Sequence, residues 1–151
     1  MIYAAVADML ARFGQAELIE LSDPDGGAVC AERIQVKLDD AHATVDGWIG
    51  RRYQLPLAGC AKPVSTPGAE PERVAPAQLT RITCDLARFW LRDAAAEDSD
   101  VYRRYRAALA DLQAIAEGRM LLTCPWGGSA GVLLAQEAQH GFAPAGDLRG
   151  Y

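Results

Sequence analysis

The stretch VCAERIQVKLDDAHATVDGWIGRRY, residues 29–53, decides the fold of this chain. Its apolar positions recur at alternating spacings of four and three residues, and they are Ile34, Leu38, Ala41, Val45 and Trp48. This spacing places them on one face of a helix that can be buried along most of its length. We therefore expect the longest helix here, ending near Tyr53 because Pro56 cannot continue it.

Shorter helices are expected on both sides of this one, at residues 4–13, 15–21, 76–95 and 100–117. Residues 58–76 hold four of the eight prolines and show no periodicity, which predicts a long surface loop. No segment has a strong strand pattern. The expected fold is all-α, a small bundle of about five helices with a Pro-rich loop and an irregular C-terminal tail.

The 151 residues suit one domain, which we divide into a helical part, residues 1–118, and a tail, residues 119–151. The tail holds six of the fourteen glycines. Gly- and Pro-rich segments that bury little cannot offset about 1–2 kcal/mol of backbone entropy per residue. We therefore expect the 58–76 loop and the tail to be flexible, or ordered only through another subunit.

The composition is that of a globular protein, with 50% apolar and 23% charged residues. No apolar run approaches the roughly 20 residues that span a bilayer, and the opening MIYAAVADMLARF lacks the basic start of a secretory signal. We expect a cytoplasmic protein that is not inserted in a membrane. The net charge of −5 argues against a protein that grips nucleic acid.

The four cysteines are widely spaced, at Cys30, Cys60, Cys84 and Cys124. No C-x-x-C pair is present, so the spacing gives no support to a zinc site. Without a secretory signal a disulfide framework is equally unsupported. We expect free, scattered thiols.

One helical flank could offer metal ligands, because Asp39, His42 and Asp46 stand at i, i+3 and i+7. A single helix supplies only part of a coordination shell, so we expect a polar flank and no metal. The GGSAG at 127–131 does not match a phosphate-binding loop, and no Ser-His-Asp or Cys-His signature is present. We expect neither a cofactor nor catalytic residues. A metal-dependent enzyme built on these three residues is a weaker alternative.

A basic cluster, Arg103, Arg104 and Arg106, lies in the last expected helix. Asp100 and Asp111 are close enough in sequence for pairing within the helix, which is the expected arrangement. A small helical DNA-binding regulator that uses these arginines is the alternative.

The segment DGWIGRRYQLPL, residues 46–57, is expected to end the long helix and turn away from it. The expected core anchors of this helix and of the helix at 76–95 are Trp48, Tyr53, Leu86, Phe89 and Trp90. We expect Leu55 and Leu57 near the surface beside Arg51 and Arg52, as a protein-contact patch, because interfaces are enriched in arginine and aromatic residues.

Four segments together resemble one protein family: YAAVADMLARFGQAELIELSD (3–23), DGWIGRRYQLPL (46–57), LTRITCDLARFWL (79–91) and YRRYRAALADLQAIAEGRMLL (102–122). The chain resembles the Mu-like phage and prophage proteins that are placed among head–tail connector or head-completion proteins. The resemblance follows the order of the chain over most of residues 3–122.

This resemblance implies a structural adaptor that forms a homo-oligomeric ring at the portal vertex. The implied partners are the portal and the tail or stopper proteins of a phage, with DNA only passing through a channel. It also implies assembly in the cytoplasm of a bacterial host and a final place in the neck of the virion. An acidic ring suits a channel that passes DNA without holding it.

Overall fold

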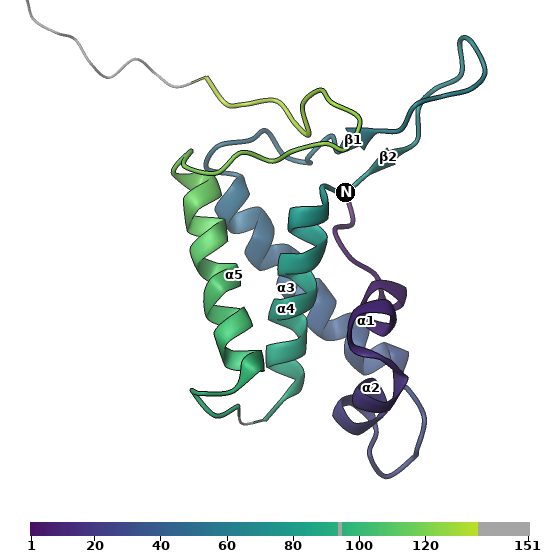
Figure 1. Cartoon of the computed structure of the whole chain (residues 1–151), viewed down its shortest axis with the longest axis vertical. Coiled ribbons are helices and arrows are strands. Elements are labelled where there is room, and N and C mark those ends of the chain that lie inside the picture. Colours follow the sequence, from purple (N-terminus) through teal and green to yellow (C-terminus); the bar gives the residue numbers. More distant parts are fainter. Residues whose placement is uncertain (94, 136–151) are drawn as a thin grey trace, which may run out of the picture.

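The computed structural model describes residues 1–93 and 95–135. Within them the chain forms five helices and one two-stranded sheet (Figure 1). In chain order the elements are α1 (Val6–Phe13), α2 (Gln15–Ser22), α3 (Ala31–Ile49), β1 (Cys60–Ala61), β2 (Arg73–Val74), α4 (Ala77–Leu91) and α5 (Asp100–Ala116). The expectation of a mostly helical fold with about five helices is confirmed, and the sheet is a small addition to it.

Helices α3, α4 and α5 pack side by side as a three-helix bundle, and α1 and α2 cover one flank of α3 and α4 (Figure 1). The apolar stripe of α3 faces the other two helices, and its fully buried members are Ile34, Leu38, Ala41, Val45 and Ile49. Leu79, Ile82 and Leu86 of α4, with Leu112 and Ile115 of α5, complete this core.

Helix α3 is shorter than expected, since it begins at Ala31 and ends at Ile49 rather than Tyr53. Gly50 closes the helix, and the chain makes one more turn in which the Tyr53 N–H donates to the Ile49 carbonyl at 2.8 Å. Helix α5 begins where Ser99 caps it, because the Ser99 hydroxyl accepts from the Tyr102 N–H at 3.2 Å.

The five expected core anchors fall into two groups. Tyr53 and Leu86 are buried, whereas Trp48, Phe89 and Trp90 are partly exposed. The ring of Phe89 stacks on Tyr105 of α5 with centroids 3.8 Å apart, so it joins α4 to α5 at the margin of the core.

The Pro-rich segment forms a hairpin. Strands β1 and β2 pair antiparallel, with Cys60 opposite Val74. Beyond them the main-chain N–H of Lys62 donates to the Glu72 carbonyl at 2.9 Å, and the side chains of the same two residues form an ion pair at 2.8 Å. The intervening residues project away from the bundle (Figure 1).

Residues 119–135, here called the strap, cross the end of the bundle (Figure 1). Their packing corrects two expectations. The segment packs on its own chain, with Leu122 and Ala130 buried. A disulfide joins Cys60 to Cys124, so these cysteines are not free thiols. The remainder of the expected tail, residues 136–151, lies outside the described residues.

No helix within residues 1–93 and 95–135 is long and apolar enough to cross a membrane.

Candidate assembly surface

The strap lies against the segment that follows α3. The N–H of Gln54 donates to the Val132 carbonyl at 2.7 Å, and the N–H of Leu134 donates to the Arg52 carbonyl at 2.8 Å. Between them Tyr53 and Leu133 face each other as an antiparallel bridge. These bonds fix the strap in register across the end of the bundle.

This register leaves a group of apolar side chains exposed. Val132 is 61% exposed, Leu133 48% and Leu134 44%, and Leu55 in the facing segment is 38% exposed. Trp126, in the preceding turn of the strap, is 46% exposed. We call these five residues the apolar strap surface. Exposed apolar groups of this kind mark contact sites more often than a scattered single residue does.

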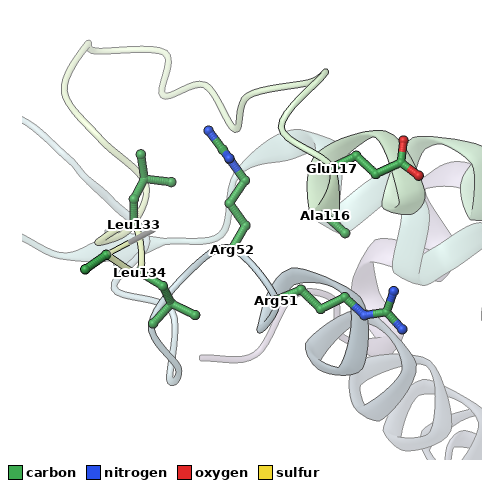
Figure 2. A pocket seen from close by; sticks show the side chains of 7 residues that line it. Arg51, Arg52, Ala116, Glu117, Leu133 and Leu134 are labelled. Atoms are coloured by element: carbon green, nitrogen blue, oxygen red, sulfur yellow. The ribbon is translucent and has the colours of Figure 1, made fainter. Parts of the chain in front are cut away.

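Arginine lies beside the apolar strap surface. Arg51 and Arg52 line a shallow pocket together with Ala116, Glu117, Leu133 and Leu134 (Figure 2). The guanidinium of Arg51 lies 4.8 Å from the ring centre of Trp48, which holds its charge over the end of α3.

Arg52 is partly buried by a different contact. A side chain at Gly118 would come within 2.6 Å of its guanidinium, so the glycine leaves room for Arg52 to cross the end of α5. The positive φ of Gly118, 76°, also favours glycine at this position.

Of the expected contact patch, Leu57 must be reassigned. Leu57 is 3% exposed and belongs to the core, where the strap covers it at Gly131. The sequence predicts both Leu55 and Leu57 near the surface, but the strap buries only the second leucine. Leu55, Arg51 and Arg52 remain at the surface or beside it.

The flank of α3 that carries Asp39, His42 and Asp46 anchors the N-terminal segment. Nε2 of His42 accepts from the N–H groups of Tyr3 and Ala4, at 3.2 and 3.1 Å. The Tyr3 hydroxyl donates to Asp46 at 2.5 Å. Asp39 lies apart from this contact and accepts from Gln35.

The titration of His42 follows from this environment. Burial lowers the pKa of His42, although Asp39 and Asp46 oppose the effect. A ring nitrogen that accepts two N–H groups must be unprotonated, so the contact needs the neutral imidazole. The same burial, with Asp46 alongside, raises the pKa of Tyr3.

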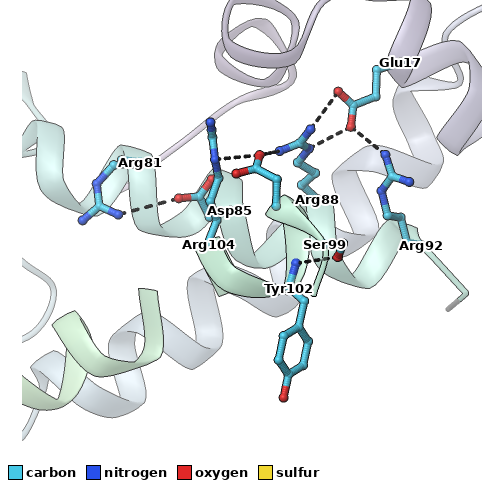
Figure 3. Close-up of polar contacts among 9 residues, drawn as sticks. Glu17, Arg81, Asp85, Arg88, Arg92, Ser99, Tyr102 and Arg104 are labelled. Atoms are coloured by element: carbon cyan, nitrogen blue, oxygen red, sulfur yellow. Dashed lines mark hydrogen bonds and ion pairs between the residues drawn. The ribbon is translucent and has the colours of Figure 1, made fainter. Parts of the chain in front are cut away.

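A second polar region ties α2, α4 and α5 together (Figure 3). Glu17 of α2 accepts from Arg88 at 2.7 and 3.0 Å and from Arg92 at 3.0 Å. Burial acts to raise the pKa of Glu17, but the hydrogen bonds from Arg88 and Arg92 outweigh it and lower the pKa. Arg88 and Arg92 of α4 therefore bind α2.

Asp85 stands at the centre of this region with 5% of its surface exposed. Arg81 lies 3.6 Å from it but makes a closer pair, 2.6 Å, with Asp111 of α5. Burial raises the pKa of Asp85, and Arg81 and Arg104 only partly compensate. The expected pairing of Asp111 within α5 is thus replaced by a pair between helices.

The three arginines of α5, Arg103, Arg104 and Arg106, are all exposed. Arg104 pairs with Asp100 one turn earlier at 3.0 Å, as expected for neighbours on a helix. Arg104 also lines a pocket with Arg12 and Phe13 of α1 and Arg81 and Asp85 of α4.

The strap itself was missed from the sequence, although a signal was present. Leu121, Leu122, Trp126 and the run Val132–Leu134 are apolar residues within an otherwise Gly-rich segment. Such residues indicate a segment that has something to bury or to bind, and the structure buries Leu122 while it leaves Leu121, Trp126 and Val132–Leu134 exposed.

Comparison with known proteins places these features in a family. The model of the family described as "Bacteriophage Mu, Gp36" matches residues 3–130, which include α1 to α5, the hairpin and the strap as far as Ala130. The chain is also 26% identical over 123 residues to the Mu-like prophage FluMu protein gp36 of Haemophilus influenzae, covering 81% of this chain and 76% of that protein. A match that spans the bundle and most of the strap shows that the chain belongs to the bacteriophage Mu Gp36 family.

Proposed function

We propose that this protein is a structural component of a Mu-like phage or prophage particle, a head–tail connector or head-completion adaptor that forms a ring at the portal vertex. Its partners are then further copies of itself, the portal, and a tail or stopper protein. The observation that carries the proposal is the apolar strap surface beside Arg51 at one end of the bundle.

This surface has the composition of a protein interface. Interfaces combine large apolar or aromatic side chains with arginine at their margin. Trp126 and Leu55 supply the first, and Arg51 supplies the second. The strap also holds this surface on a rigid base, since its main chain is bonded to the segment after α3.

The two connections at the other end of the bundle carry exposed acidic residues, which favours contact between unlike surfaces. The α2–α3 loop and the α4–α5 connection lie at the end opposite the strap (Figure 1). Their exposed acidic residues are Asp25, Asp93, Glu97 and Asp98. A ring repeats a contact between two different patches of neighbouring subunits, and opposite charges favour such a contact over pairing of identical patches.

A non-enzymatic role fits the use of the polar residues. His42 and Asp46, the strongest candidates for chemistry, are engaged in holding Tyr3 and Ala4. We propose no cofactor, and DNA is proposed only as a passing occupant of the ring, in keeping with the net charge of −5.

Assembly on phage heads tests the proposal. Val132→Asp and Leu55→Asp place a charge on the apolar strap surface, and Val36→Asp is the control because Val36 is 56% exposed on α3. A host carrying a Mu-like prophage that lacks this gene is complemented with each variant. We expect at least tenfold fewer infectious particles, with heads and tails left unjoined, for the strap variants only. Normal particle yield from both strap variants, folded by circular dichroism, would refute the proposed surface.

A further inference from the structure

The Cys60–Cys124 disulfide is the only covalent cross-link among the described residues, and it fastens the strap. Cys60 begins β1 and is fully buried, whereas Cys124 lies in the strap and is partly exposed. The two residues are 64 positions apart in the sequence, with Cα atoms 5.4 Å apart. This distance suits a disulfide, so the two sulfurs remain neighbours when the bond is open and the strap is docked.

The other anchors of the strap are noncovalent. Leu122 and Ala130 are its buried apolar side chains, together with the backbone of Gly131. On one side of Cys124, Gln78 holds Leu121 and Thr123 through hydrogen bonds of 3.0 Å. Three main-chain hydrogen bonds also hold the strap, from Gln54 to Val132, from Leu134 to Arg52 and from Gly59 to Ala130. Most remaining strap side chains are exposed, so opening the disulfide leaves the strap held by these noncovalent contacts alone.

The helical bundle has an apolar core that remains when this bond is open. The core is made mainly of side chains from α3, α4 and α5, although α4 and α5 lie within the loop that the disulfide closes. Loss of the cross-link should therefore loosen the strap and leave the bundle folded.

We propose that Cys60 and Cys124 form a redox-modification site that responds to small-molecule thiols and disulfides. In the oxidised state the strap is covalently fastened, and in the reduced state it undocks far more often. The chemical class of reactant is a low-molecular-weight thiol such as glutathione, together with its disulfide.

The exchange reaction has a defined direction of attack. A small thiolate attacks the sulfur of Cys124, because that of Cys60 is buried, and the bond between the two cysteines breaks. Cys60 leaves as a thiolate and takes up a proton, while Cys124 carries the mixed disulfide. A second small thiolate then attacks the mixed disulfide, which releases the Cys124 thiolate and a small disulfide. The two electrons gained by the protein come from the two small thiols, and oxidation is the reverse.

The other two cysteines are poorly placed to interfere. Cys84 is buried in α4, and burial raises the pKa of its thiol to about 12, which keeps it protonated and unreactive. Cys30 precedes α3, while the disulfide lies beyond the other end of that helix. The site is thus a pair that exchanges with small molecules and not with its own neighbours.

The redox chemistry does not depend on the proposed function. Only the effect of the redox state on particle assembly rests on that function. Trp126 and Val132 belong to the strap, so fastening the strap would order most of the proposed contact surface. A particle that leaves a reducing host for an oxidising medium would then gain a fixed connection.

Thiol counting and hydrogen exchange on the full chain test the site. The protein is equilibrated with glutathione or with glutathione disulfide, quenched with acid, denatured and labelled with a maleimide. We expect four labelled cysteines after glutathione and two, Cys30 and Cys84, after the disulfide. Strap amides should exchange at least tenfold faster in the reduced protein, while amides of α3 and α4 remain slower to exchange than those of the strap.

Two variants provide the controls. Cys124→Ser should exchange its strap amides at the fast rate under both conditions, and Cys30→Ser should respond as the natural protein does. Four labelled cysteines after equilibration with glutathione disulfide would overturn the proposal, and so would equal strap exchange in the oxidised and reduced proteins. Particle assembly is not part of this readout, so a failed connector role leaves its result unaffected.

Discussion

Replacing Gly131 by alanine should destabilise the protein, because the strap approaches the bundle most closely there. An added Cβ would lie 2.5 Å from Cδ1 of Leu57 and 3.3 Å from Cδ1 of Tyr53. Carbon atoms in contact prefer about 3.5–4.0 Å, so Leu57 would have to retreat by roughly 1 Å. Leu57 and Tyr53 are only 3% and 4% exposed, so neither can swing into water.

The expected cost of Gly131→Ala is about 1–3 kcal/mol, as for other overpacked core sites. This cost cannot exceed the free energy of undocking the strap, because undocking removes the clash. Leu57→Ala alone should cost about 2–5 kcal/mol. It also removes the clashing atom, so Gly131→Ala should cost less than ~0.5 kcal/mol in that background, which makes the two changes coupled rather than additive.

Urea unfolding of the four oxidised proteins, followed by circular dichroism, measures this cycle. Gly47→Ala serves as a control of opposite sign, since no atom lies within 4 Å of its added Cβ and alanine favours a helix by roughly 0.5–1 kcal/mol. If Gly131→Ala cost the same with and without Leu57→Ala, or cost nothing, the strap would not be packed on its own chain as described.

Three further outcomes are expected. Between pH 7 and 5 the natural protein should lose more stability than the His42→Gln variant. In the unfolded state His42 takes up a proton near its usual pKa of 6.5, whereas in the folded state its lowered pKa keeps it neutral, so acid favours unfolding. Equal pH profiles of the two proteins in thermal unfolding would contradict this. Glu17→Gln should cost about 1–3 kcal/mol in urea unfolding, with most of that loss absent when Arg88→Gln is already present. Neutralising the three exposed arginines of α5 should leave gel shifts on duplex DNA unchanged at physiological salt, and a tight sequence-specific shift abolished by that change would favour the regulator alternative.

The helices could be predicted because their information is local. The spacing of Ile34, Leu38 and Val45 requires only that a helix exists and has one face to bury, and the structure buries that face. The predicted end of α3 is four residues too late because it is set by Pro56, whereas Gly50 already closes the helix. In the structure Tyr53 is buried by the bridge to Leu133, a residue 80 positions away that periodicity cannot detect.

Polar residues could be located but not given partners. The sequence places Asp39, His42 and Asp46 on one flank of α3, yet their different uses depend on where the first residues of the chain lie. In the same way, helical spacing places Arg88 and Arg92 on α4 but does not show that Glu17 of α2 is their partner. Helical spacing fixes the direction of a side chain, and only tertiary packing fixes what it meets.

In the strap, one long-range contact decides whether several residues are buried or exposed. Composition predicts that a Gly-rich segment cannot offset its loss of backbone entropy, and that argument holds for a segment considered alone. The cross-link between Cys60 and Cys124 alters the balance, because it limits the freedom of the unfolded chain as well as adding a contact. Once the strap is held, Leu57 becomes core, while Leu55 and Val132 are left exposed. The surface proposed for assembly therefore depends on the same contact that the spacing of the cysteines gave no reason to expect.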